Sequence, residues 1–198
     1  MEIRFMSKTK IRYPEVMVFA GPNGSGKTTI KNEITTIGVY INADDIKKEE
    51  KCSDMDAAKK AEILRELMLE KFEDFTFETV LSTDRNLKLL QKAKEKGFFI
   101  RCIYVLTSDY KINIARVIMR EHKGGHGVPE EKIKSRFQRA FKLIPELVEV
   151  CDIIHIYDNT EEPFRIFKKK KSEYYHWEND YWSFSDIENI TKISDYDN

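Results

Sequence analysis

The chain has 198 residues, of which 41% are hydrophobic and 34% charged, and its 34 basic residues balance 34 acidic ones. A net charge of zero argues against binding to nucleic acid or a membrane surface through a global electrostatic field, and three widely spaced cysteines favour a reducing compartment over a disulfide framework. No apolar run reaches the roughly 18 residues of a membrane span, and the N-terminus lacks a signal-peptide pattern, so we expect a cytoplasmic protein with no membrane partner.

The first predicted elements are a strand, a glycine-rich loop and a helix. Residues 15–20 form an apolar run that predicts a buried strand, preceded by an arm over residues 1–14. The next loop matches the phosphate-binding pattern G-x-x-x-x-G-K-[ST] at every fixed position, and a helix is expected after it to about Thr36. The loop residues are Gly21, Pro22, Asn23, Gly24, Ser25, Gly26, Lys27 and Thr28, followed by Thr29.

The composition of this loop explains its chemistry. Glycines let the backbone curl so that successive N–H groups point at phosphate oxygens, and the positive end of the following helix adds to the attraction. Lys27 is expected to reach the outer phosphates of a nucleotide, and the Thr28 hydroxyl to bind Mg²⁺. A glycine-rich turn before an ordinary helix is the alternative, but the strand–loop–helix order is the context that the motif requires.

The middle of the chain alternates strands with helices. Strands are predicted over residues 38–42, 75–80 and 98–106, the last a continuous apolar run typical of a strand buried on both faces. Helices are predicted over residues 56–71 and 85–96. The expected apolar stripe of the first of these helices consists of Ile63, Leu64, Leu67 and Met68.

Two helices around a glycine-rich loop come next. Ser108 or Asp109 is expected to cap a helix reaching about Glu121, and residues 122–128 form the loop. Pro129 opens the following helix. Helices that flank such a loop look like a lid that closes over phosphates.

The C-terminal part begins with a fifth strand, predicted over residues 152–157. Residues 164–167 and 174–177 are expected to form a hairpin, followed by a loosely packed tail. We therefore interpret the chain as a single domain, with a core over about 15–160 and a hairpin and tail over about 161–198.

This alternation predicts an α/β fold of the P-loop NTPase kinase type, with a parallel five-stranded sheet flanked by helices, a lid and a C-terminal hairpin. Ligands of such sheets bind beyond the carboxyl ends of the strands. The phosphate loop, Asp44, Glu78 and Asp158 all come at predicted strand ends. Four separated stretches are therefore expected to converge on one rim.

Two carboxylates on that rim are candidates for the chemistry of phosphoryl transfer. Asp44 is placed to orient an acceptor hydroxyl and take its proton. The alternative is that Asp44 or Asp45 caps the helix from Ile46. Glu78 is an acid late in an apolar strand, and because an unpaired buried carboxylate is costly, it should contact substrate, support Mg²⁺ through water or form a structural ion pair.

Four arginines lie on the two helices of the expected lid. Arg116 and Arg120 share one helix face before the glycine-rich loop, and Arg136 and Arg139 lie beyond it. Arginine binds phosphate bidentately and keeps its charge, so we expect at least one of the set to reach the γ-phosphate, although each alone is typical of a solvated surface. His126 is a candidate ligand or base, with a plain loop residue as the alternative.

Together these segments make the chain resemble the zeta-toxin family of P-loop kinases from about Val16 to Thr160. The phosphate loop alone is generic, and its combination with the other segments is more specific. Those other segments are Ile41-Asn42-Ala43-Asp44-Asp45-Ile46, Phe77-Glu78-Thr79-Val80-Leu81-Ser82, Gly124-Gly125-His126-Gly127-Val128-Pro129 with Arg136, and Tyr157-Asp158-Asn159-Thr160.

The resemblance implies an ATP-dependent small-molecule kinase with ATP and Mg²⁺ as cofactors. Well-studied members phosphorylate the sugar 3′-hydroxyl of UDP-N-acetylglucosamine, and many are toxins held in check by an antitoxin. Carried over, Lys27 and Thr28 bind ATP and Mg²⁺, Asp44 is the base, and Glu78 touches the sugar nucleotide. Arg120 would be a lid arginine on the transferring phosphate.

The chain departs from the family pattern near the acceptor. Studied members have Thr and Arg shortly after the glutamate, where this chain has Val80 and Ser82. Ser82 and His126 join the candidate acceptor-binding residues. The family's second lid arginine falls near His126, so Arg136 or Arg139 must take its role here.

Two other functions stay open. One is a P-loop kinase for a different hydroxyl, such as a nucleic-acid 5′ end or an antibiotic, and the other is a nucleotide-dependent switch without transfer. The zero net charge argues against a nucleic-acid acceptor. The sequence contains no [NT]-K-x-D motif, which argues against a GTPase.

Overall fold

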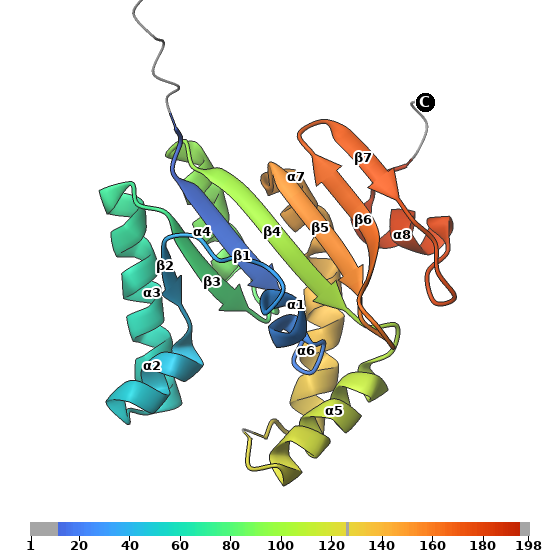
Figure 1. Cartoon of the computed structure of the whole chain (residues 1–198), viewed down its shortest axis with the longest axis horizontal. Coiled ribbons are helices and arrows are strands. Elements are labelled where there is room, and N and C mark those ends of the chain that lie inside the picture. Colours follow the sequence, from blue (N-terminus) through green and yellow to red (C-terminus); the bar gives the residue numbers. More distant parts are fainter. Residues whose placement is uncertain (1–11, 126, 195–198) are drawn as a thin grey trace, which may run out of the picture.

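The computed structural model describes residues 12–125 and 127–194, so the candidate His126 lies outside the described residues. Its centre is one seven-stranded sheet in the order β2-β3-β1-β4-β5-β6-β7 (Figure 1). The first five strands are parallel, while β6 and β7 run antiparallel to their neighbours. The strands are β1 (Glu15–Ala20), β2 (Val39–Ile41), β3 (Phe75–Thr79), β4 (Phe99–Leu106), β5 (Ile153–Asp158), β6 (Phe164–Lys170) and β7 (Glu173–His176).

The predicted α/β fold is confirmed, but the prediction of five strands is wrong. The expected hairpin is present as β6 and β7, and it continues the sheet beyond β5 instead of standing apart from it. Ile156 of β5 pairs with Phe167 of β6, and both side chains are fully buried. The buried Ile156 and Phe167 side chains therefore hold the hairpin in the sheet, next to the lysine-rich residues 168–171.

Helices cover both faces and one edge of this sheet. Figure 1 shows α4 and α7 behind the sheet, α1 in front of it and α5 beyond the carboxyl ends of β1 and β4. No helix in the described part of the chain is long and apolar enough to cross a membrane. The helices are α1 (Lys27–Lys31), α2 (Ala43–Glu50), α3 (Asp54–Lys71), α4 (Arg85–Glu95), α5 (Tyr110–His122), α6 (Glu130–Lys142), α7 (Ile144–Val150) and α8 (Phe184–Thr191).

The central strands are apolar on both faces because each face is covered. Alternate residues of a strand point to opposite sides, so Phe77 and Tyr104 join the large core cluster behind the sheet. Phe19 and Val105 join a smaller cluster in front, which Ile30 of α1 covers. This burial on both faces is typical of parallel strands.

The buried face of α3 differs from the predicted stripe. Ile63 and Leu67 are exposed by 65% and 41%, and of the predicted residues only Met68 is buried. The helix instead buries Ala57, Ala61, Arg65, Met68 and Leu69. Small alanines let this face approach the sheet closely, so the helix turns its larger aliphatic residues to solvent.

The tail is also better packed than predicted. Trp182 and Ile187 are buried, with 7% and 0% exposure. Ser183 begins α8 with a capping box in which the Ser183 hydroxyl accepts from the Asp186 N–H and the Asp186 carboxylate accepts from the Ser183 N–H. Burial and capping together make α8 part of the core that includes α7.

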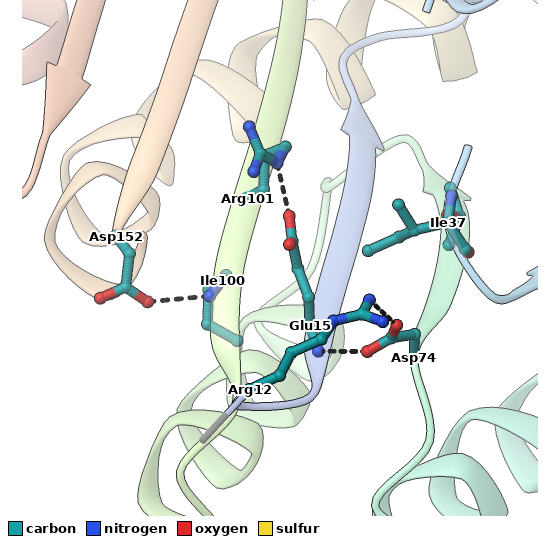
Figure 2. A network of polar contacts seen from close by, with 8 residues as sticks. Arg12, Glu15, Ile37, Asp74, Ile100, Arg101 and Asp152 are labelled. Carbon is teal, nitrogen blue, oxygen red and sulfur yellow. Dashed lines mark hydrogen bonds and ion pairs between the residues drawn. The ribbon is translucent and has the colours of Figure 1, made fainter. Parts of the chain in front are cut away.

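A polar network joins the strands at the edge away from the phosphate loop (Figure 2). Asp74, just before β3, accepts from the Glu15 N–H at 2.8 Å and also pairs with Arg12. Glu15 in turn pairs with Arg101 of β4. Asp152 accepts from the Ile100 N–H at 2.8 Å in the same way. These contacts fix the starts of β1, β3, β4 and β5. The phosphate loop lies at the opposite edge, where these parallel strands end.

Candidate active site

The phosphate loop takes a backbone path that only glycine allows. Gly21, Gly24 and Gly26 have φ of 140°, 78° and 92°. A Cβ atom would lie 2.0 Å from the Val105 carbonyl oxygen at the first of these and 2.0 Å from the Asn159 Nδ2 atom at the last. The loop therefore closes tightly against its neighbours, with its last glycine as the N-cap of α1.

Two asparagines brace the loop from elsewhere in the chain. Asn113 of α5 donates from Nδ2 to the Asn23 carbonyl oxygen at 2.7 Å, and Asn159, after β5, donates to the Ser25 carbonyl oxygen at 2.8 Å. Both asparagines are buried. Neither was a predicted site residue, although Asn159 stands in a segment that supports the family resemblance. These bonds hold two loop carbonyl groups in place and so help to fix the backbone of the loop.

Lys27 folds back onto its own loop. Its Nζ donates to the carbonyl oxygens of Gly21 at 2.7 Å and Pro22 at 3.1 Å. Burial lowers the pKa of Lys27 to about 8, and the neighbouring Glu78 and Asp44 carboxylates oppose that shift. The positive charge of Arg120 also lowers the pKa of Lys27. The ammonium group therefore lies at the meeting point of three predicted site residues.

Glu78 is held by a cluster that the sequence did not predict. Tyr40 of β2 donates its hydroxyl to Glu78 Oε1, and Lys31 Nζ of α1 lies 3.4 Å from the same oxygen. The Tyr40 hydroxyl also accepts from Lys31 at 3.0 Å and from the Asn42 side chain at 3.2 Å. Glu78 thus forms an ion pair and also lines a cavity of about 880 Å³, with Oε2 outside these contacts.

Asp44 occupies the first turn of α2, which begins at Ala43, earlier than the predicted Ile46. Asn42 is the N-cap, and its Oδ1 accepts from the Asp44 N–H at 2.9 Å. Capping is therefore the task of Asn42. The Asp44 and Asp45 side chains are exposed and both line the same cavity.

The four arginines separate by their contacts. Arg116 donates to the Asn159 and Thr160 carbonyl oxygens at 2.7 and 3.0 Å, which ties α5 to the loop after β5. Arg136 donates to Asn23 Oδ1 of the phosphate loop at 3.2 Å, and with Arg116 and Arg120 it lines the cavity.

Arg139 lies elsewhere. Its Nε donates to the Ser82 carbonyl oxygen at 3.1 Å, and neither Arg139 nor Ser82 lines the cavity. Of the two candidates for a second lid arginine, Arg136 is the one beside the phosphate loop.

The cavity, which we call the catalytic cleft, has a volume of about 880 Å³. The chemistry of its donor groups fits a nucleoside triphosphate, because glycine-rich backbone, Lys27 and arginines surround it. The described residues contain no group of three or more His, Cys, Asp or Glu side chains able to hold a metal ion. A Mg²⁺ ion would therefore rely on the exposed Thr28 hydroxyl together with phosphate oxygens and water, as this ion commonly does.

The chain is similar in sequence to known proteins. A family model described as zeta toxin matches residues 2–172. An uncharacterized protein of Haemophilus influenzae is 29% identical over 129 residues, which are 62% of this chain and 92% of that protein.

Solved structures show the same fold. A chain of the AvrRxo1-ORF1:AvrRxo1-ORF2 complex with sulphate ions has a TM-score of 0.69 at 15% identity, over 93% of this chain and 66% of that chain. A chain of the AvrRxo1-ORF1:-ORF2 structure with ATP has a TM-score of 0.69 at 14% identity, over 93% of this chain and 66% of that chain. A chain of the PezAT chromosomal toxin–antitoxin system of Streptococcus pneumoniae gives 0.57 at 19% identity, over 79% of this chain and 72% of that one.

Proposed function

The chain belongs to the zeta-toxin family, and from that premise we propose that it is an ATP-dependent kinase that phosphorylates a sugar hydroxyl of a UDP-activated sugar. The observation that carries this proposal is the catalytic cleft itself. One cavity of about 880 Å³ brings together the phosphate loop, Asp44, Glu78 and Arg120. Phosphoryl transfer needs a phosphate cradle, a group that positions the acceptor oxygen and positive charge on the transferring group, and these residues supply all three.

Lys27 and the loop backbone hold the phosphates. With a pKa of about 8, Lys27 is about nine-tenths protonated at pH 7. Phosphate oxygens would replace the Gly21 and Pro22 carbonyl oxygens as acceptors of its hydrogens. ATP supplies the phosphoryl group, and Thr28 would hold a Mg²⁺ ion, which would supply positive charge beside the phosphate oxygens.

Asp44 and Glu78 position and activate the acceptor. Asp44 is exposed to the cleft and is not occupied in capping α2, so its carboxylate is free to accept the proton of an acceptor hydroxyl. Tyr40 and Lys31 fix Glu78 through Oε1. Oε2 then accepts a hydrogen bond from a second hydroxyl of the sugar, which orients the ring.

Arg120 and Arg136 stabilise the charge that spreads over the transferring group. Both line the cleft, and Arg136 is anchored to the phosphate loop through Asn23. Fixed donors of this kind act most strongly where charge develops in the transition state.

UDP-N-acetylglucosamine is our proposed acceptor, and an antitoxin our proposed partner. The acceptor is supported by the two carboxylates that face a common cleft, which suit a polyol, and by family membership. The antitoxin is supported by the PezAT neighbour, which is part of a toxin–antitoxin system.

Mass spectrometry of reactions with ATP and separate UDP-sugars tests the proposal. We expect a gain of one phosphate on the UDP-sugar, ADP production that depends on the acceptor, and loss of both in Lys27→Ala. If another alcohol is phosphorylated and no UDP-sugar is, the proposed kinase activity stands and the proposed UDP-sugar acceptor is refuted. ADP production that ignores every acceptor would refute phosphotransfer.

A further inference from the structure

A second cavity, which we call the α3–α4 cavity, lies between these two helices and has a volume of about 340 Å³. It is on the sheet face opposite α1, because its Arg65 packs on Phe77 of the core behind the sheet. Its lining is strongly charged, with three acidic and four basic side chains. The ion pairs among the described residues show which of these side chains has none.

All three acids are already neutralised by bases of the same cavity. Their partners are long side chains that remain well exposed at the rim. The pairs are Glu62–Arg85 at 3.2 Å, Glu66–Lys92 at 2.5 Å and Asp84–Lys88 at 2.5 Å.

Arg65 is the exception. It is only 6% exposed, it lies 5.2 Å over the Phe77 ring, and it makes no hydrogen bond or ion pair with any residue that the structure describes. Its Nε is buried with no partner, and burial lowers the pKa of its guanidinium group. The Glu62 and Glu66 carboxylates oppose that shift without forming an ion pair with Arg65. A buried charge that lacks an ion pair is costly to a folded protein, and a bound oxyanion would offset that cost.

One hydrogen bond and one face of α3 link the α3–α4 cavity to the catalytic cleft. Asn86 lines the cavity and donates to Thr79 Oγ1 at 2.7 Å, while Thr79 lines the cleft and accepts from the Gly21 N–H at 3.2 Å. On α3, Ala57 lines the cleft, and Arg65 follows two turns later on the same buried face, about 12 Å further along the helix axis.

We propose that the α3–α4 cavity binds a phosphate group of the acceptor, with Arg65 as its anchor. This inference rests on the proposed function, because it places the anionic part of the acceptor here while the reacting hydroxyl lies at Asp44. The guanidinium fork matches phosphate oxygens. Arg85, Lys88 and Lys92 form exposed ion pairs at the rim, so they can turn toward a phosphate at little cost.

Binding of UDP tests the site without any transfer reaction. The protein is first saturated with Mg²⁺ and a non-hydrolysable ATP analogue, so that UDP cannot occupy the phosphate loop. UDP and uridine are then titrated into the wild type, Arg65→Met, Arg65→Lys and the control Lys59→Met, an exposed residue of the same helix. We expect UDP to bind at least about tenfold more weakly to Arg65→Met, with Arg65→Lys between, and uridine to bind all four proteins alike.

Thermal unfolding separates this role from a structural one. Methionine keeps the packing on Phe77 and removes the unpaired charge, so we expect Arg65→Met to melt at or above the temperature of the wild type. A lower melting temperature with unchanged UDP affinity would assign Arg65 to folding and overturn the inference. Equal UDP binding by all variants would also overturn it, while phosphotransfer to a UDP-sugar would still stand. Loss of UDP affinity in Arg65→Met without any transfer would support the site and refute only the proposed reaction.

Discussion

The hydroxyl group of Tyr40 on β2 and the carboxylate of Glu78 on the neighbouring β3 form a hydrogen bond at the carboxyl edge of the sheet. Lys31 of α1 reaches both groups. Because both contacts use Glu78 Oε1, they fix the carboxylate and leave Oε2 outside these contacts, while Glu78 lines the cleft. The structural ion pair and the acceptor contact, which the sequence posed as alternatives, are therefore compatible.

Tyr40→Phe should weaken acceptor binding. The substitution keeps the ring beneath Lys31 and removes one hydrogen bond to a charged group, which is worth about 1.5 kcal/mol or more. We expect the KM for the acceptor to rise roughly tenfold and the KM for ATP to stay within a few-fold. Tyr181→Phe, which removes an exposed tyrosine–glutamate bond to Glu161, is the matched control. A rise in KM for ATP alone would contradict this role for Glu78.

Asp44→Asn should abolish base catalysis while preserving shape. We expect ATP affinity within a few-fold of the wild type and phosphotransfer lower by about 10²-fold or more. Asp45→Asn is the natural comparison, since Asp45 is the next residue of the same helix turn and lines the same cleft. A damaging Asp45→Asn beside a harmless Asp44→Asn would move the base by one position.

The pKa of Lys27 predicts proton uptake when ATP binds. In the free protein burial lowers this pKa from 10.5 to about 8, and phosphate oxygens favour the charged form and raise it again. Above pH 8 the free protein has lost the proton that the complex holds, so ATP affinity should fall by up to about tenfold per pH unit.

Calorimetry in buffers of different ionisation enthalpy measures the protons taken up. We expect uptake approaching one proton at pH 9 and little at pH 6.5. Lys27→Met should bind ATP weakly with no such uptake. Uptake that persists in Lys27→Met would assign the proton to another group.

Much of the fold was accessible to sequence analysis because it depends on local patterns. The glycine spacing of the phosphate loop and the alternation of apolar strands with helices are encoded within a few residues of one another. The buried face of α3 could not be predicted from the sequence, because Ala57 and Ala61 are weak hydrophobic signals next to Ile63 and Leu67. Helix approach to the sheet, a tertiary effect, decided which face was buried.

The site shows the same division. Lys27, Asp44 and Glu78 stand in motifs, and the structure brings their side chains into one cleft. Asn159 reaches the Ser25 carbonyl oxygen across 134 residues of sequence, and Asn113 reaches Asn23 across 90. No local pattern encodes such contacts, so the groups that brace the loop emerge only from the fold.

Arginine substitutions in the lid should separate transition-state contacts from packing. Arg120→Ala and Arg136→Ala remove cations that line the cleft, and charge on the transferring group is greatest in the transition state. We expect each to lower kcat by about 10-fold to 10³-fold, more than it raises the KM for ATP. Arg139→Ala is the control, because Arg139 bonds the Ser82 carbonyl oxygen outside the cleft, and it should keep kcat within a few-fold of the wild type.

Steady-state kinetics with both substrates varied measure the split between kcat and KM. An effect of Arg120→Ala on KM alone would restrict Arg120 to ground-state binding. If Arg139→Ala is the damaging change and Arg136→Ala is harmless, the loop carrying Ser82 must move into the cleft on acceptor binding. Because Arg136 is already hydrogen-bonded to Asn23 of the phosphate loop, we expect Arg136 to act as the second lid arginine without any such movement.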